Sequence, residues 1–451
     1  MRSWPDGALA VIPTPATASD RGIARPLLRG AGWRIGRPLQ AIVLAFSLVA
    51  CSPGVPELEQ HAYVWKRVGT ERVDGANLPR GLSALRVLRA QFDADGRLSA
   101  VMLPPDTGVQ ADILPVVRIE GSVTPADAGA IGAVVQTLLE EQAARGRTPW
   151  IEIDHDVARS RVPEYADWLG RLRARTTVPA HWSITALPDW AHHRDLGRLL
   201  QTVDAYTLQV HAVAAPADGL FDARGAHDAI RRFAERSPRP FFVALPTYAM
   251  RVGLSADGAV RYVESETSVA ALAADDRVLF ADPFVLQAFV RQLRQERPSS
   301  LQGVAWFRLP DRADQRAISP RTFAALVDDI DLAATQWLDL VPVGNSNNRD
   351  LWLRNAGPDD AAAAAVVRLP PGCRVGERRA GIDTDGASLR PPIGELLRAG
   401  QRRRLGWAFC TGASFSSRLP ASVPVDAGAH AAAVADPSTN AGSAAVVPAV
   451  P

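Results

Sequence analysis

Eight short runs with strand character, most of them separated by helical segments, constrain the fold of this chain most strongly. The runs lie at 61–67, 83–92, 113–121, 150–156, 182–187, 206–211, 241–248 and 303–309. Alternation of strand and helix implies parallel pairing, because each helix carries the chain back across the sheet. We therefore predict an α/β fold with a (β/α)8 barrel of the TIM type over residues 61–335, and keep a doubly wound open sheet as the alternative.

Two connections depart from a regular barrel. The link 67–83 contains Gly and Pro and is too short for a full helix, and the stretch 250–300 is long enough to hold an insertion before its helices. The helical segments are clearer. In 125–145, apolar residues recur at helical spacing.

The pattern changes near residue 338. Strand-like runs with Asn and Gly turns follow at 338–343, 350–355, 364–369 and 403–409. They predict a small antiparallel, sandwich-like β domain over 336–411. Residues 412–451 are rich in Ala, Pro and Ser and carry hardly any charge, which predicts a disordered tail.

The N-terminal 50 residues have the pattern of an export signal with an unusually long N-tail. Arg34 and Arg37 precede the apolar stretch 39–50, which is too short to span a bilayer as a helix but fits the apolar region of a signal peptide. Small residues before Cys51 resemble the bacterial lipobox. That resemblance implies a lipidated Cys51, a leash over 51–60 and anchoring in the cell envelope, facing the periplasm. The alternative is a buried apolar strand with an incidental cysteine.

The net charge bears on the class of binding partner, and the two remaining cysteines bear on whether the chain contains a disulfide. The chain has 50 Lys and Arg against 48 Asp and Glu, a net charge of +2, so no overall field favours nucleic acid as a partner. If Cys51 carries lipid, Cys373 and Cys410 remain as an even pair in an oxidising compartment. A disulfide between them and two buried thiols are both open.

The fourth predicted strand carries three acids on one face. Side chains alternate along a strand, so Glu152, Asp154 and Asp156 oppose Ile151 and Ile153. Helices cover the outside of such a barrel, which places the acids in its interior and at its carboxyl-end mouth, where barrel enzymes hold their active sites. Crowded like charges raise at least one pKa, as acid/base catalysis requires.

The same alternation and the strand ends supply further candidates. We expect these residues to bind a ligand: Arg118, Glu120, Gln209, His211, Tyr248, Trp306 and Arg308. The structural alternative is a satisfied buried ion-pair network, for example Arg118 with Glu120 or Glu152.

The segment 153–161, Tyr165 and the run 182–187 resemble a known family. The run 153–161, in which Val157 separates Asp156 from Ala158, and Ser183-Ile184-Thr185-Ala186-Leu187 are similar to motifs of the bacterial domain-of-unknown-function family numbered 3142. The resemblance covers most of 61–310. It implies exported proteins of the same barrel class and no particular reaction.

A weaker resemblance is to glycoside hydrolases of the chitinase type. Glu152, Asp154, Asp156 and Trp306 occupy similar places, although those enzymes end the motif in Glu and this chain has Asp156. The resemblance implies a glycan ligand. We therefore carry a glycan hydrolase with strand-four acids as acid and base, and a non-catalytic glycan- or anion-binding protein. A metal site from Asp154, Asp156 and His211 is a weaker hypothesis, and no cofactor is predicted.

Overall fold

The computed structural model describes residues 57–65, 78–101, 111–121, 128–211, 219–255, 260–264, 276–312, 314, 316–392, 394–411 and 417–421. The predicted signal, Cys51 and most of the predicted tail lie outside these residues.

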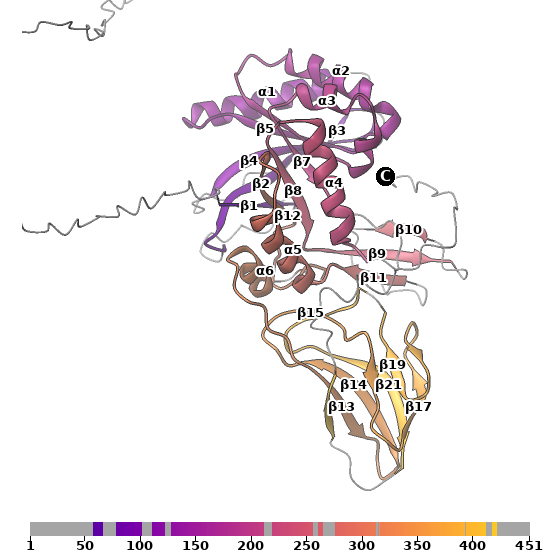
Figure 1. Cartoon of the computed structure of the whole chain (residues 1–451). Helices are drawn as coiled ribbons and strands as arrows, with labels where there is room; N and C mark the ends of the chain where they lie inside the picture. The colour runs from indigo at the N-terminus through magenta and orange to yellow at the C-terminus, as the bar shows by residue number, and fades with distance from the viewer. Residues whose placement is uncertain are drawn as a thin grey trace, which may run out of the picture. The chain divides into compact units, whose positions relative to one another are not determined.

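Eight parallel strands form a closed barrel (Figure 1). They are β1 (Glu59–Val64), β2 (Leu82–Phe92), β4 (Asp112–Ile119), β5 (Trp150–His155), β6 (His181–Ala186), β7 (Ala205–Gln209), β8 (Phe241–Pro246) and β12 (Leu301–Phe307). Strand β1 pairs in parallel with both β12 and β2, so the sheet returns on itself. The predicted (β/α)8 barrel is confirmed, and closure excludes the open sheet.

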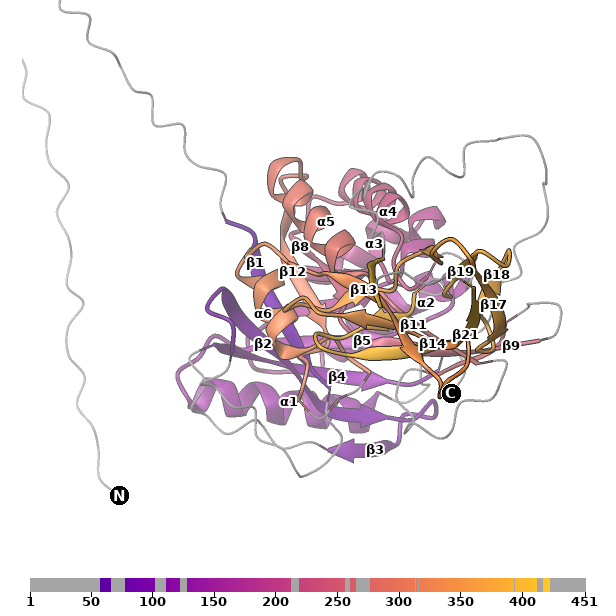
Figure 2. The same ribbon diagram turned by 90° about the horizontal axis from the view of Figure 1, so that it is seen from below.

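Helices surround the barrel strands, and Figure 2 shows α1 and α5 on opposite sides of them. The α-helices are α1 (Gly129–Ala144), α2 (Val162–Arg173), α3 (Leu196–Gln201), α4 (Ala223–Arg236), α5 (Pro283–Gln295) and α6 (Pro320–Val327). Three of these helices begin at a residue whose side chain caps the helix N-terminus. Side chains of Asp222, Asp282 and Ser319 cap α4, α5 and α6, and satisfy backbone N–H groups that have no partner within the helix.

The main core lies between the strands and these helices. Outward residues of β5, Ile151 and Ile153, are fully buried there, as are Trp168 of α2 and Phe233 of α4. The short 3₁₀ helices η2 (Arg159–Arg161) and η3 (Pro188–His192) follow β5 and β6.

Antiparallel strands occur at two further places, one at the edge of the barrel sheet and one in a sheet of its own. Strand β3 (Leu98–Val101) pairs with β2, a strand that the sequence reading missed. Strands β9 (Ala249–Leu254), β10 (Val260–Glu264) and β11 (Asp276–Phe280) form a separate three-stranded sheet inside the predicted insertion.

The C-terminal region is antiparallel, as predicted. A five-stranded sheet has the order β17-β21-β14-β13-β22, formed by β13 (Gln336–Pro342), β14 (Asn348–Asn355), β17 (Cys373–Arg378), β21 (Arg402–Cys410) and β22 (Arg418–Pro420). Two small sheets comprise β15 (Ala361–Ala362) with β20 (Leu396–Leu397), and β16 (Val367–Arg368), β18 (Asp383–Thr384) and β19 (Ser388–Arg390).

Side chains from one face of the large sheet share a core with those of the small sheets. Cys373 and Cys410 lie opposite each other on β17 and β21 and are joined by a disulfide.

The predicted end of this domain at residue 411 is wrong. Strand β22 lies within the stretch assigned to a disordered tail and pairs with β13, Trp337 opposite Pro420 and Leu338 opposite Leu419. A three-residue strand in low-complexity sequence carries no periodic signal of its own, and backbone pairing with β13 fixes it.

Candidate active site at the carboxyl ends of the barrel strands

The lowest of the three strand acids, Glu152, is sealed inside the barrel. Its side chain is 0% exposed and forms an ion pair with Arg86, which is itself buried. Tyr63 Oη donates to Glu152 Oε1 at 2.6 Å, and Thr207 Oγ1 and Ser183 Oγ donate to Oε2 at 2.9 and 3.1 Å. Every carboxylate oxygen is therefore already bonded to protein. This corrects the prediction of Glu152 as a catalytic residue, because a ligand cannot reach it.

Asp154 and Asp156 lie nearer the mouth and share one arginine. Arg118 Nη1 donates to Asp154 Oδ2 and Nη2 pairs with Asp156 Oδ2, each at 2.9 Å. Thr185 Oγ1 donates to Asp154 Oδ1 at 2.7 Å, and Gln209 Nε2 reaches one oxygen of each acid at 3.5 Å. The guanidinium of Arg118 holds the two carboxyl groups side by side.

The two acids differ in access to solvent. The whole of Asp154 is 4% exposed, whereas the side chain of Asp156 is 22% exposed and that of Arg118 is 23% exposed. Asp154 is thus the inner member of the pair, and Asp156 is the member that a ligand at the mouth can contact.

Burial sets the proton affinity of the inner acid. The pKa of Asp154 is raised from 3.8 to about 6. Desolvation is the largest cause; the charge of Arg118 opposes it, and the charge of Asp156 adds to it. Burial alone would lower the pKa of Arg118, but Asp154 and Asp156 together raise it, so the arginine stays charged. The site therefore combines a fixed cation with a carboxyl group that takes up a proton near pH 6.

Aromatic side chains gather at the same end of the barrel around Phe307. The ring of Phe307 lies 5.2 Å from that of Trp65, 5.4 Å from Tyr63, 5.3 Å from Tyr248 and 5.8 Å from His211, centroid to centroid. His211 Nδ1 lies 3.2 Å from the carbonyl oxygen of Ala244, and burial lowers the pKa of its imidazole. The negative charge of Asp156 opposes this lowering of the His211 pKa.

Trp306 does not belong to this group, contrary to the prediction. It is 0% exposed in the outer core, its Nε1 donates to Gln60 Oε1 at 2.7 Å, and its ring packs against Phe323 of α6. Alternation assigns the interior position of β12 to Phe307 instead. The sequence analysis assigned Trp306 to the inward face of this strand. The run 303–309 is apolar on both faces, so its pattern does not show which residues point inward.

Arg308 and Glu120 have partners of their own. Arg308 pairs with Asp314 at 2.6 Å, so it is held by the loop after β12. Glu120 accepts a hydrogen bond from Gln91 at the end of β4. The structural alternative named Arg118 with Glu120 or Glu152 as an example of a buried ion pair, whereas the structure pairs Arg118 with Asp154 and Asp156.

Sequence reasoning missed Tyr63, Arg86, Thr185 and Phe307. Alternation from Trp65 points to Tyr63, and alternation from Ser183 points to Thr185. Arg86 lies in the predicted strand 83–92 without any local signal that distinguishes it from a surface arginine.

Within the described residues, no three His, Cys, Asp or Glu side chains are arranged to hold a metal ion. Over the same ranges, no helix is long and apolar enough to cross a membrane.

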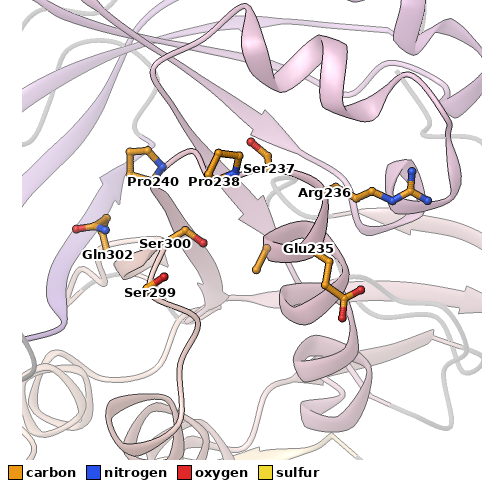
Figure 3. Close-up of a pocket in the computed structure, with 9 residues that line it drawn as sticks. Glu235, Arg236, Ser237, Pro238, Pro240, Ser299, Ser300 and Gln302 are labelled. Carbon is orange, nitrogen blue, oxygen red and sulfur yellow. The ribbon is translucent and has the colours of Figure 1, made fainter.

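A separate depression of about 740 Å³ lies at the opposite, amino-terminal ends of β8 and β12. Figure 3 shows Ser237, Pro238 and Pro240 before β8 facing Ser299, Ser300 and Gln302 at the start of β12. It is a wide, open surface feature without a pair of acids. The acids at the carboxyl ends are therefore the stronger candidate for chemistry.

Solved structures with similar backbones are distant. The spore cortex-lytic enzyme SleL of Bacillus cereus is 15% identical with a TM-score of 0.43, over 61% of this chain and 75% of that one. SleL of Bacillus megaterium is 12% identical with a TM-score of 0.44, over 62% and 76%. Catalytic domain 2 of the Ostrinia furnacalis group II chitinase is 12% identical with a TM-score of 0.40, over 61% and 97%. These values are too low to transfer a reaction or a substrate to this chain.

No curated protein sequence matches the chain. Residues 110–312 match the family model described as Domain of unknown function (DUF3142), in agreement with the resemblance seen in the strand motifs. The match runs from the start of β4 to the end of β12 and includes Arg118, Asp154, Asp156 and Phe307.

Proposed function

We propose that this protein is an envelope-anchored hydrolase that acts on a glycan with the Asp154–Asp156 pair. The observation that carries the proposal is the pair itself. Two carboxyl groups share Arg118, the inner one takes up a proton near pH 6, and the outer one is open to a ligand. Pairs of acids whose environments separate their proton affinities are typical of acid/base catalysis.

The aromatic group around Phe307 supports a sugar as the ligand. Binding sites for small molecules combine apolar and aromatic walls with a few placed polar groups. The C–H faces of sugar rings pack on aromatic rings, and sugar hydroxyls hydrogen-bond to groups such as Gln209 and His211. In this chain Gln209 Nε2 lies 3.5 Å from Asp156 Oδ1, and the ring of His211 stacks on that of Phe307.

The proposed reaction is general acid/base hydrolysis. The proton held by Asp154 passes by way of Asp156 to the glycosidic oxygen as the C–O bond breaks. Water adds its oxygen to the anomeric carbon and returns one proton to the carboxylate pair. Asp154 holds the exchangeable proton, and Arg118 keeps the two acids adjacent. A positioned acid of this kind contributes about 10²–10⁴-fold to the rate.

Product analysis tests this proposal. The full chain is incubated in H₂¹⁸O with defined amino-sugar, neutral and uronic acid oligosaccharides, and products are analysed by mass spectrometry. We expect ¹⁸O at one new reducing end, and at least a hundredfold loss of rate in Asp156→Asn. The matched control is Asp204→Asn. The side chain of Asp204 is 29% exposed and pairs with Arg173, and this variant should keep the wild-type rate. Equal rates in both variants would show that Asp156 takes no part in the reaction.

The arginine bridge favours a second candidate, a glycan-binding protein without turnover. Arg118 engages both acids, and these ion pairs stabilise the charged carboxylates, which disfavours proton transfer. Saturable binding of an oligosaccharide that Asp156→Asn weakens, with no product after long incubation, would support this candidate over the hydrolase.

We also propose that the protein is exported and tethered through a lipidated Cys51, on the strength of the apolar stretch 39–50 and the small residues before the cysteine. Each buried methylene of an acyl chain adds about 0.8 kcal/mol to membrane binding. Cys51→Ala should therefore move the protein from the membrane fraction to the soluble fraction. A variant that still sediments with membranes after a high-salt wash would show that the apolar stretch is an uncleaved anchor.

A further inference from the structure

The outer face of the five-stranded sheet in the C-terminal region is unusually aromatic. Core side chains such as Leu351, Leu353, Leu405 and Ala408 take one face of β14 and β21. The alternate positions form the other face, which carries four partly exposed aromatic residues: Trp337, Trp352, Trp407 and Phe409. A solvent-facing sheet surface is ordinarily polar, so packing does not account for these rings.

Three arginines accompany the rings. The guanidinium of Arg402 lies 4.7 Å from the ring of Trp352, and that of Arg374 lies 5.6 Å from the ring of Phe409. Arg354 lies directly opposite Trp337. We call these seven residues the aromatic–arginine face.

Positive charges outnumber negative ones on this face, although Glu377 lies there and accepts a hydrogen bond from Trp407 Nε1 at 3.2 Å. Neighbouring arginines there are paired: Arg404 with Asp350 and Arg418 with Asp339. In the described part of the chain, by contrast, no carboxylate forms an ion pair with Arg354, Arg374 or Arg402.

Arg354 and Arg402 also lie directly opposite each other in the β14–β21 register. Like charges in that arrangement destabilise a sheet, and an anionic ligand between them would relieve the repulsion.

We propose that the aromatic–arginine face binds an acidic polysaccharide. Flat rings offer surfaces for sugar rings, and guanidinium groups recognise carboxylates through paired N–H donors. The combination fits a polymer of uronic acid units better than a neutral glycan, which would leave the arginine charges unmatched. This site is separate from the barrel acids and does not depend on their proposed chemistry.

The test is affinity electrophoresis of the full chain through gels that contain polygalacturonate, with hydroxyethylcellulose as the neutral polymer. We expect wild-type protein to be retarded by polygalacturonate alone, and the dissociation constant to rise at least tenfold in Trp352→Ala and in Arg402→Gln. Arg402 is exposed, so its replacement leaves the core intact even if Trp352→Ala folds poorly.

Two control variants separate this face from charged side chains elsewhere on the protein. Arg231→Gln removes an equivalent exposed charge on α4, where Arg231 pairs with Asp228, and should leave retardation unchanged. Asp204→Asn, which removes an acid paired with Arg173 outside both proposed sites, should also leave it unchanged. Equal weakening by Arg231→Gln and Arg402→Gln, equal retardation in the neutral polymer, or binding only to phosphatidylglycerol vesicles would each overturn the proposal.

Discussion

Replacing Asp154 by Asn should change how the stability of the protein depends on pH. The pKa of this acid rises from 3.8 to about 6 on folding, mainly because the group is buried. Between those two values the folded state holds a proton that the unfolded state has lost, so stability falls as pH rises through this window. Each pH unit is worth about 1.36 kcal/mol, so the ionised acid costs about 3 kcal/mol above pH 6.

An asparagine side chain cannot ionise and escapes that cost. The effect of Asp154→Asn on the free energy of unfolding should therefore be about 2 kcal/mol more favourable at pH 8 than at pH 4, where the unfolded-state carboxyl is already partly ionised. Comparison of the two pH values cancels those consequences of the substitution that do not depend on pH, such as a change in packing. Urea denaturation followed by tryptophan fluorescence measures both values. An effect equal at pH 4 and pH 8 would refute the reasoning, because Asp154 would then have an ordinary proton affinity.

Three further predictions concern stability. Glu152→Gln should cost about 3–5 kcal/mol in urea denaturation because it leaves the buried charge of Arg86 unmatched, and a cost below about 1 kcal/mol would contradict the sealed ion pair. Replacing Cys373 and Cys410 by Ser should cost up to about 4 kcal/mol, since the bond closes a loop with a sequence separation of 37; unchanged denaturation with and without reductant would contradict this. Trp306→Ala should cost about 3–5 kcal/mol through the cavity it creates in the outer core, and thermal melts that match wild type would place Trp306 elsewhere.

The barrel could be predicted because its signals are local and repeated. The strand-four acids alternate with Ile151 and Ile153, and that alternation placed Asp154 and Asp156 correctly on the inward face. Closure of the sheet follows from eight such units. The same periodicity could not find β3 or β22, because both are short and depend on a partner strand for their hydrogen bonds.

The sequence could not predict which arginine pairs with each of the strand-four acids. Glu152 and Asp154 are two residues apart on the same face, yet only the three-dimensional structure shows that Arg86 reaches the first and Arg118 the second. Those arginines come from different strands, and sequence spacing does not encode which acid each one meets. Trp306 and Phe307 show a related limit, since adjacent aromatic residues leave the parity of β12 undecided.

A crystal structure of Asp156→Asn with a bound oligosaccharide tests the central claim most directly. The account predicts a sugar ring against Phe307 and Trp65, with a glycosidic oxygen within hydrogen-bond distance of the side chain at position 156. An oligosaccharide that occupies only the aromatic–arginine face, or a mouth in which no sugar approaches position 156, would contradict it.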